Sequence, residues 1–489
     1  MLFDVAIIGY GPTGATMANL LAMGGHSVLV IDKEADLYPL PRAVHFDDEV
    51  MRIFQTIGIA KPLSQAVHIN PGMRFIDQHD RLLLDWPRPQ QITSHGWHAS
   101  YRLHQPDLER LLRDRLADYA DVTTLTNMAV TAIRDLPDYS LITGTDRTTG
   151  RIDTFTARFV IGCDGANSFV RQHIAAEMED LGFAEDWLVI DVVLDSPRSD
   201  LGDHTIQFCY PDRPMTYCRN PGARRRWEFA LKKEEDREAI CAPETIWQLL
   251  SKWISPQEAT LERRQVYTFR SHLAQSWQQG RYFLAGDAAH LTPPFMGQGM
   301  CMGIRDAANL SWKLDSVLAG KTDMAILDSY MAERAPHARA FIETAIHLGG
   351  LIHSLDTETA LRLADPKSEG HKQLKPLAPK LGTSALFDET QHQMMPDVGR
   401  PCPQIKVGNN QTPMDDMAGA NHIIIATCRP ENLASDILCL TPDDSPQIAP
   451  LLAQQNAEAL WVRPDRYIGA MAADAKHAKQ LFPGFLWDS

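Results

Sequence analysis

Residues 3–14 have the sequence FDVAIIGYGPTG, and residues 28–32 have the sequence VLVID. Both stretches contain short apolar runs, which predict buried strands. Between them, residues 12–24 repeat apolar side chains at helical spacing, which predicts a helix. Two strands joined by a helix within about 30 residues make a β-α-β unit. This part of the chain therefore predicts the first unit of an α/β fold.

The turn between the first strand and the helix contains three glycines, Gly9, Gly11 and Gly14. In a dinucleotide site the first permits a tight turn, the second lets the backbone approach a pyrophosphate, and the third lets helix and strand pack closely. The helix N-terminus offers free N–H groups to an anion. Asp32 ends the second strand, where a carboxylate can accept ribose hydroxyl bonds, and Lys33 follows it. We interpret this unit as a dinucleotide site; the alternative is a tight turn without a ligand.

Two later segments extend this interpretation. Residues 163–171 have the sequence CDGANSFVR, and residues 286–300 have the sequence GDAAHLTPPFMGQGM. In the second segment, a strand is predicted to end at Gly286, so that Asp287 can bond a sugar-like chain. A helix is predicted to begin near Gly299, and its N–H groups can stabilise negative charge on a reduced flavin ring.

The chain resembles the flavoprotein aromatic hydroxylases, which are single-component FAD monooxygenases. The three segments match the GxGxxG, DG and GD motifs of that family, and residues 286–314 resemble its flavin-binding signature. The resemblance covers about residues 1–350. It is greatest to the 3-(3-hydroxyphenyl)propionate hydroxylase group, through PRAVHFDDEVMRIFQTIG at 41–58 and RRRWEF at 224–229.

This resemblance implies which residues contact the cofactor. The predicted FAD-binding residues are Gly9, Gly11, Gly14, Asp32, Lys33, Arg42, Gln105, Asp164, Asp287, Pro294, Gly297, Gly299 and Met300. In the family the DG aspartate is linked to both FAD and NAD(P)H, the GD aspartate contacts the ribityl chain, and the last four positions lie along the isoalloxazine. Many members have Asn where this chain has Cys301, which puts a side-chain contact at that position in doubt.

The family's activity is the first functional hypothesis. The protein would use FAD, NADH or NADPH and O2 to hydroxylate a phenol similar to 3-hydroxyphenylpropionate, ortho to its hydroxyl, through a flavin C4a-hydroperoxide. An alternative is an FAD enzyme of the same scaffold that acts on a non-phenolic substrate, as an epoxidase or a dehydrogenase. Another alternative is a flavin-binding protein without catalysis.

A free phenol has a pKa of about 10, so a base in the site would help to form the phenolate. Asp47 and His45 are the candidates for this catalytic role. Asp47 is equally suited to the start of a helix, where its charge favours the dipole, and His45 to ordinary packing. Tyr217 and Arg226 are candidates for contact with the substrate. The alternatives are packing for Tyr217 and an exposed turn for Arg226.

The expected fold is α/β with α+β inserts: a Rossmann-like, GR2-type FAD-binding domain interleaved with a β-sheet substrate domain, followed by a small thioredoxin-like domain. The FAD-binding domain is expected at 1–75, 100–185 and 270–365, and the substrate domain at 76–99 and 186–269. The thioredoxin-like domain, without a redox C-x-x-C, is expected at 386–489. A second glycine fingerprint after a strand was not found, which disfavours a separate NAD(P)H domain.

The composition excludes several other classes of protein. A net charge of −15 disfavours a sequence-independent binder of nucleic acid. The eight cysteines include no C-x-x-C pair, so we predict neither a metal site nor a dithiol pair. We expect no transmembrane helix, reduced thiols and a cytoplasmic protein. Relatives are often dimers, so a homodimer is a further expectation.

Overall fold

The computed structural model describes residues 1–364, 367, 377–387, 395–475 and 478–487. Its first layer is an eight-stranded sheet in the order β17-β18-β11-β1-β2-β8, with β10 and β9 continuing from β11. The strands are β1 (Leu2–Ile8), β2 (Val28–Ile31), β8 (Val122–Leu125), β9 (Met128–Asp135), β10 (Ser140–Asp146), β11 (Ile152–Gly162), β17 (Gln278–Gln279) and β18 (Tyr282–Leu284). The five strands from β18 to β8 are parallel.

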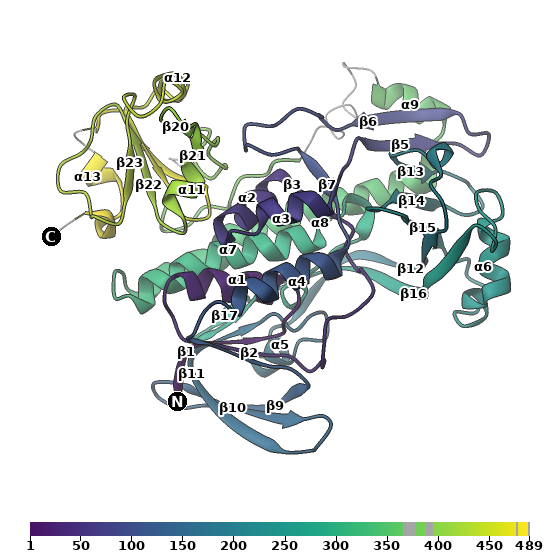
Figure 1. Ribbon diagram of the computed structural model, residues 1–489, viewed down its shortest axis with the longest axis horizontal. Coiled ribbons are helices and arrows are strands. Elements are labelled where there is room, and N and C mark those ends of the chain that lie inside the picture. The colour runs from purple at the N-terminus through teal and green to yellow at the C-terminus, as the bar shows by residue number, and fades with distance from the viewer. Residues whose placement is uncertain (365–366, 368–376, 388–394, 476–477, 488–489) are drawn as a thin grey trace.

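Helices stack on this sheet in the middle of the molecule (Figure 1). The helix α1 contacts both α4 and α7, and it buries the face that carries Ala15, Ala18 and Leu21. The helices of this region are α1 (Pro12–Met23), α2 (Asp48–Ile57), α3 (Ala60–Ala66), α4 (Gln105–Leu116), α5 (Phe169–His173), α7 (Gly299–Leu318), α8 (Ser329–Ser354) and α9 (Thr357–Ala364). The predicted β-α-β unit is therefore confirmed as β1, α1 and β2.

A second eight-stranded sheet, on the right of Figure 1, has the order β19-β16-β12-β15-β14-β13-β5-β6. One face of this sheet is covered by α6 (Pro243–Leu250), which shares an apolar cluster with Leu188 and Ile190. The opposite face packs in part on α8 and α9, and other side chains of this face line a cavity. The strands are β5 (Gly72–Ile76), β6 (Leu82–Pro87), β12 (Met178–Leu194), β13 (Thr205–Phe208), β14 (Met215–Arg219), β15 (Arg224–Ala230), β16 (Ala259–Ala274) and β19 (His290–Leu291).

A three-stranded sheet in the order β3-β7-β4 lies between the large sheets. Its strands are β3 (His45–Asp47), β4 (His68–Ile69) and β7 (Ser100–Arg102), and β3 leads directly into α2. The strands of the second large sheet begin slightly before residues 76 and 186. The proposed domain boundaries stay a prediction.

The C-terminal unit consists of the described residues 395–475 and 478–487, and it forms a separate lobe at the left of Figure 1. Its sheet has the order β23-β22-β24-β25, in which β22 and β23 are parallel and the other pairs are antiparallel. Its elements are β20 (Lys406–Val407), β21 (Thr412–Pro413), α11 (Met414–Ala418), β22 (Ile423–Ala426), β23 (Leu438–Leu440), α12 (Ile448–Gln454), β24 (Ala459–Val462), β25 (Ile468–Ala472) and α13 (Ala478–Leu481). A thioredoxin-like class for this unit stays a prediction.

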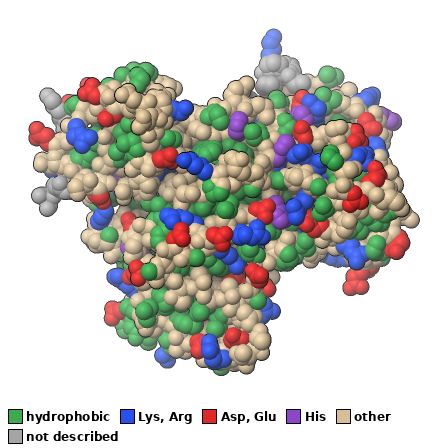
Figure 2. All heavy atoms as spheres, in the orientation of Figure 1, with side chains coloured by type: hydrophobic (Ala, Val, Ile, Leu, Met, Phe, Trp, Pro, Cys, Tyr) green, Lys and Arg blue, Asp and Glu red, His purple; other side chains and the backbone are tan. Residues whose placement is uncertain are grey.

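The surface carries both charges. On the face in Figure 2, basic and acidic side chains are intermixed and do not gather into one basic patch. Within the described ranges, no helix has both the length and the apolar composition that a membrane crossing requires.

Candidate active site

A cavity of about 830 Å³ lies between the two large sheets. It extends from Gly11 at the start of α1 to the face of the second sheet opposite α6. Ten predicted site residues line this cavity: Gly11, Arg42, His45, Gln105, Arg226, Asp287, Pro294, Gly297, Gly299 and Met300. Seven others do not: Gly9, Gly14, Asp32, Lys33, Asp47, Asp164 and Tyr217.

The three glycines of the first turn meet different surroundings. Gly9 has a φ of +106°, and a Cβ there would lie 2.3 Å from the carbonyl oxygen of Cys163. A Cβ on Gly14 would lie 2.0 Å from the carbonyl oxygen of Gly9. At Gly11, by contrast, a Cβ would meet no atom within 4 Å. Gly9 and Gly14 are therefore required by close packing, whereas Gly11 leaves open space at the cavity wall.

Asp32 supports this turn from the end of β2. One oxygen of its carboxylate accepts a hydrogen bond from the Tyr10 N–H at 2.5 Å, and the other accepts one from the Glu34 N–H at 2.7 Å. The side chain of Lys33 is exposed. In this structure Asp32 therefore shapes the glycine turn from outside the cavity.

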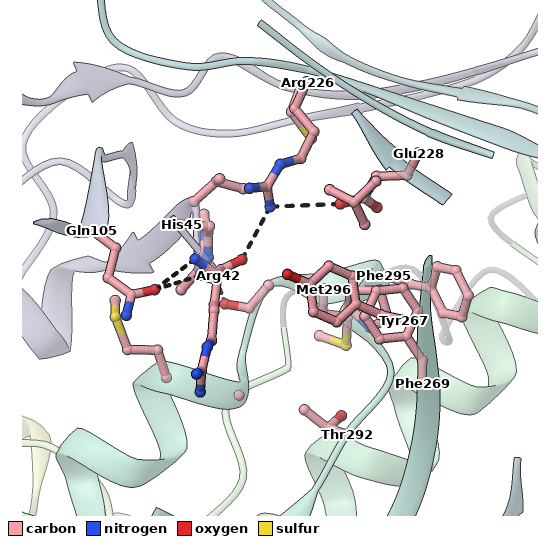
Figure 3. A pocket seen from close by; sticks show the side chains of 18 of the residues that line it. Arg42, His45, Gln105, Arg226, Glu228, Tyr267, Phe269, Thr292, Phe295 and Met296 are labelled. Atoms are coloured by element: carbon pink, nitrogen blue, oxygen red, sulfur yellow. Dashed lines mark hydrogen bonds and ion pairs between the residues drawn. The ribbon is translucent and has the colours of Figure 1, made fainter. Parts of the chain in front are cut away.

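The loop that carries Arg42 is held by Gln105. The amide oxygen of Gln105 accepts hydrogen bonds from the backbone N–H of Arg42 at 3.0 Å and of Ala43 at 2.7 Å (Figure 3). Its amide nitrogen donates to Glu109 at 2.7 Å. Because both the oxygen and the nitrogen of this amide form hydrogen bonds, Gln105 orients the Arg42 loop at the cavity edge.

Asp164 lies behind the cavity wall. Its carboxylate accepts a hydrogen bond from the Phe169 N–H at 2.6 Å, at the start of α5, and burial raises its pKa. Its neighbours Cys163 and Gly165 do line the cavity. The DG segment thus presents backbone to the cavity while its aspartate stabilises a helix start.

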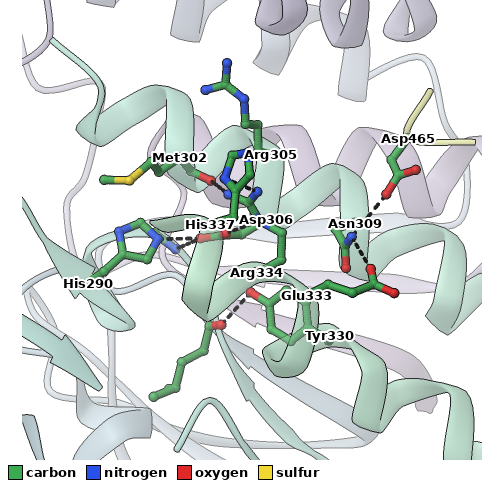
Figure 4. A network of polar contacts seen from close by, with 12 residues as sticks. His290, Met302, Arg305, Asp306, Asn309, Tyr330, Glu333, Arg334, His337 and Asp465 are labelled. Carbon is green, nitrogen blue, oxygen red and sulfur yellow. Dashed lines mark hydrogen bonds and ion pairs between the residues drawn. The ribbon is translucent and has the colours of Figure 1, made fainter. Parts of the chain in front are cut away.

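Asp287 faces the cavity directly. Burial raises the pKa of its carboxyl, although the side chain is open to the cavity itself. The loop beneath it is fixed by Asp306, whose carboxylate accepts hydrogen bonds from the Gly286 N–H at 3.0 Å and from Arg334 at 2.9 Å. His290 bonds the same carboxylate at 2.6 Å (Figure 4). A rigid buried network therefore holds Asp287 at the wall.

The segment 294–300, which we call the flavin loop, leads into α7. Gly297 has a φ of +64°, and a Cβ there would lie 2.8 Å from the Cβ of His45. The first backbone N–H groups of a helix have no partner within the helix, and Gly299 and Met300 present this end of α7 to the cavity. Cys301 is fully buried, and its thiol points to the carbonyls of His45 and Gly297 at 3.8 and 3.7 Å.

The two candidate bases have different surroundings. His45 lines the cavity, and its ring nitrogens contact the Gly297 carbonyl at 3.2 Å and the Ser100 hydroxyl at 2.8 Å. Burial, reinforced by Arg102, lowers the pKa of His45 to about 3, so the ring is neutral. Asp47 accepts from Arg305 at 2.7 Å. Burial opposes its ionisation, but Arg305 outweighs burial and lowers the pKa of Asp47.

Side chains on β14 and β15 alternate between the cavity and the core, as neighbours in a strand do. Thr216 lines the cavity, whereas Tyr217 is buried on the other face, 5.0 Å from the ring of Trp227. Arg226 faces the cavity, but its guanidinium is bound to Asp191 at 2.7 Å and to the carbonyl of Arg42 at 3.0 Å. Of the two predicted substrate contacts, Tyr217 therefore packs in the core. Arg226 lines the cavity, and its buried guanidinium binds the Arg42 loop.

Sequence reasoning missed five charged residues of the cavity: Arg88, Arg102, Glu228, Arg263 and Arg270. Glu228 is two positions after Arg226 on β15, so the same alternation could have found it. Arg88 and Arg102 lie near His45, where both lower its pKa. Arg102 is buried, and its guanidinium donates to the Thr205 hydroxyl. No sequence pattern pointed to either arginine, because they come from a loop and a three-residue strand.

Known proteins share this arrangement. Residues 3–345 match the family model described as FAD binding domain. The chain is 38% identical over 429 residues to the "Probable NADH-specific resorcinol 4-hydroxylase" of Rhodococcus jostii (strain RHA1), which covers 86% of this chain and 79% of that protein. The chain belongs to the FAD-dependent aromatic hydroxylases. This confirms the resemblance found in the sequence.

The hydroxylase has further relatives along its whole length. It is 31% identical over 528 residues to the "3-(3-hydroxy-phenyl)propionate/3-hydroxycinnamic acid hydroxylase" of Escherichia coli (strain SMS-3-5 / SECEC), covering 98% of this chain and 93% of that one. The solved structure of aklavinone-11 hydroxylase with FAD and aklavinone has a TM-score of 0.81 at 20% identity, and it covers 99% of this chain and 98% of that chain. This likeness confirms the predicted fold class.

FAD is the cofactor of the hydroxylase, and the cavity fits it. Open space at Gly11 lies at the N-terminus of α1, where a pyrophosphate is favoured. The carboxylate of Asp287 faces the cavity and can accept hydroxyl bonds from a sugar-like chain. The N-terminus of α7 lies beside the flavin loop and favours negative charge. The individual contacts with FAD stay predictions.

Proposed function

We propose that this hydroxylase acts on a phenol with an acidic side chain, of the 3-(3-hydroxyphenyl)propionate type, and adds a hydroxyl ortho to the existing one. NADH or NADPH would supply the electrons and O2 the oxygen atom. One observation carries this proposal: the residues that line the cavity include more arginines than carboxylates.

The cavity is cationic although the protein is acidic. Six arginines and two carboxylates line it, in a chain with a net charge of −15. Arg226 is paired with Asp191, but Arg88 and Arg102 form no ion pair with any residue that the structure describes. Burial lowers the pKa of Arg88, and the positive charge of Arg102 adds to this effect. Arg102 is buried and Arg88 is partly buried. Charges withdrawn from water in this way call for a partner, which an anionic substrate group would provide.

The remaining wall suits a flat apolar ring. Tyr267, Phe269 and Phe295 gather with Met296 at one side of the cavity (Figure 3). The ring of Phe295 is fixed by an edge contact with Trp187 at 5.4 Å between centroids. Aromatic side chains favour stacked or edge contacts with another ring, so this wall supports an aromatic substrate.

Bound FAD, once reduced, supplies the activated oxygen for hydroxylation. The chain's own residues exclude water and orient the ring. Burial lowers the pKa of His45 to about 3, which makes its ring a weak base, and Asp47 is paired with Arg305, so their surroundings do not favour their predicted roles as bases. Glu228 is a further candidate for the proton acceptor, since it lines the cavity. Burial raises the pKa of Glu228, although Arg226 opposes this effect. Arg88 and Arg102 would in addition favour any anion near them.

The test is the oxidation of NADH and of NADPH by the FAD-loaded enzyme with 3-(3-hydroxyphenyl)propionate, resorcinol or phenol, while product and peroxide are measured. We expect the acid to stimulate oxidation most and to give a dihydroxylated product. Arg102→Met should raise KM for the acid about tenfold, which is the effect of losing one charge-assisted hydrogen bond. The same variant should change KM for resorcinol little. Stimulation by resorcinol alone would contradict the acidic side chain, and no stimulation by any phenol would contradict a phenolic substrate.

A further inference from the structure

We propose that the C-terminal unit positions the flavin loop through a chain of hydrogen bonds from Tyr467 to Glu49 to Arg305, which makes Tyr467 a positioning residue of the hydroxylase. This inference depends on the FAD site and not on the identity of the substrate.

The outer half of the chain crosses from the C-terminal unit to α2. Tyr467 lies in the turn between β24 and β25, and its side chain is buried. Its hydroxyl donates to one carboxylate oxygen of Glu49 at 2.5 Å. The other oxygen of Glu49 accepts from the Nε of Arg305 at 2.8 Å. Both oxygens of this carboxylate are thus fixed, one by each partner.

The inner half of the chain reaches the cavity wall. Arg305 is on the second turn of α7, and it donates to Asp47 at 2.7 Å and to the amide oxygen of Gln298 at 3.2 Å. Gln298 in turn donates to Asp47 at 3.2 Å. Gln298 precedes the first residue of α7 and stands between Gly297 and Gly299, both of which line the cavity. One guanidinium therefore ties the flavin loop to the start of α2.

Tyr467 acts on Arg305 through the carboxylate of Glu49. Arg305 is almost fully buried and is shared by two carboxylates, Asp47 and Glu49. The guanidinium also lies over the ring of Phe341 at 5.4 Å. The Tyr467 hydroxyl holds one oxygen of Glu49, so that the other oxygen stays oriented toward the Nε of Arg305. Without this donor, Glu49 would lose its fixed orientation, and Arg305 would lose the contact that aligns it with Asp47 and Gln298.

Docking of the C-terminal unit rests on other contacts. Arg52 of α2 binds Asp415 at 2.7 Å with both side chains buried. Arg463 binds Glu333 of α8 at 2.8 Å in a second buried cluster. Neither cluster contains a residue of the flavin loop. In Figure 4, the guanidinium of Arg305 points away from the network around Asp306. The Tyr467 chain can therefore be weakened while the unit stays docked.

The test compares Tyr467→Phe with Gln404→Leu in the full-length, FAD-loaded enzyme. Gln404 also joins the C-terminal unit to the rest of the molecule, through the carbonyl of His95 at 2.7 Å, but it does not contact Arg305. For each variant, the FAD dissociation constant, the reduction potential of bound FAD, the peroxide formed per NADH and the Tm are measured. We expect Tyr467→Phe to weaken FAD binding about fivefold, the value of one hydrogen bond, to lower the potential and to raise the peroxide fraction. Gln404→Leu should lower only the Tm.

A second variant, Glu49→Gln, keeps the test decisive if Tyr467→Phe folds poorly. It should give the same changes in the flavin properties, and the double variant should be no worse than the stronger single one, because the two residues act in one chain. If Tyr467→Phe changes only the Tm, as Gln404→Leu does, or if the two effects on the flavin add fully, the proposal is wrong.

Discussion

At the scale of single residues, the two aspartates of the DG and GD segments have opposite surroundings. Asp287 faces the cavity, whereas Asp164 accepts a hydrogen bond from the Phe169 N–H at the start of α5. We expect Asp287→Ala to weaken FAD binding at least about tenfold, because hydrogen bonds to a charged acceptor contribute about 1.5–3 kcal/mol each. The Tm of the FAD-free protein should not fall. Fluorescence titration with FAD and thermal melts of the apoprotein check both expectations.

Asp164→Ala is the control for this prediction. It removes the acceptor of the Phe169 N–H, and loss of such a hydrogen bond costs about 1 kcal/mol, so it should lower the Tm of the apoprotein. A variant at Asp287 that binds FAD normally would contradict its placement as a cofactor contact.

At the scale of elements, Gly11 and Gly14, where β1 leads into α1, have opposite surroundings. Gly14→Ala places a Cβ 2.0 Å from a backbone oxygen, so α1 must move away from β1. We expect loss of several kcal/mol of unfolding free energy, of the order seen for overpacking and backbone strain, measured by denaturant unfolding of the apoprotein.

Gly11→Ala should behave differently. Its backbone is extended, and an added Cβ meets no protein atom within 4 Å. We expect unchanged stability of the apoprotein but FAD binding weakened more than tenfold, since the methyl group fills space that the pyrophosphate needs. If Gly11→Ala binds FAD as the parent does, the pyrophosphate does not lie at this turn.

The elements themselves were predictable because they depend on local patterns. The β1-α1-β2 unit and the start of α7 follow from apolar spacing and glycine positions. The face to which a strand residue points depends on a register that the sequence does not reveal. For this reason Tyr217 was expected near the substrate, although β14 turns its neighbours Thr216 and Cys218 to the cavity.

At the scale of the whole molecule, a buried ionic cluster joins the C-terminal unit to α7 and α8. Burial opposes ionisation of Glu333, but Arg463 and Lys313 outweigh burial and lower its pKa from 4.5 to about 2. A carboxyl whose pKa is lowered on folding stabilises the protein above its unfolded pKa, and this stability is lost as the pH falls through the folded pKa. The cluster should therefore weaken between about pH 4.5 and pH 2.

Glu333→Gln tests this expectation. At pH 7 the variant should be less stable by about 3–5 kcal/mol, because it leaves buried cations without their partner. The difference from the parent should shrink as the pH approaches 3. Glu343→Gln on the same helix changes an exposed pair and should have little effect at any pH. A constant difference between Glu333→Gln and the parent would contradict the lowered pKa.

Contacts at this scale could not be predicted, since they join distant parts of the chain. Glu49, Arg305 and Tyr467 are far apart in sequence. Glu49 and Arg305 lie in the matched segments 41–58 and 286–314, but nothing in those segments indicated a contact between them or with Tyr467. Asp47 was a candidate base, with the start of a helix as the alternative. It caps α2, where its carboxylate accepts a hydrogen bond from the Val50 N–H at 3.1 Å. Its pairing with Arg305 depends on how α7 packs on α2, which only the folded structure reveals.

The most direct test of the account is a reaction under 18O2 with the FAD-loaded enzyme, NADH and 3-(3-hydroxyphenyl)propionate, followed by mass spectrometry of the product. We expect a dihydroxylated product with one 18O atom, formed in proportion to the NADH consumed. An oxidised product without 18O, or peroxide as the sole product, would contradict hydroxylation of a phenolic ring by this protein.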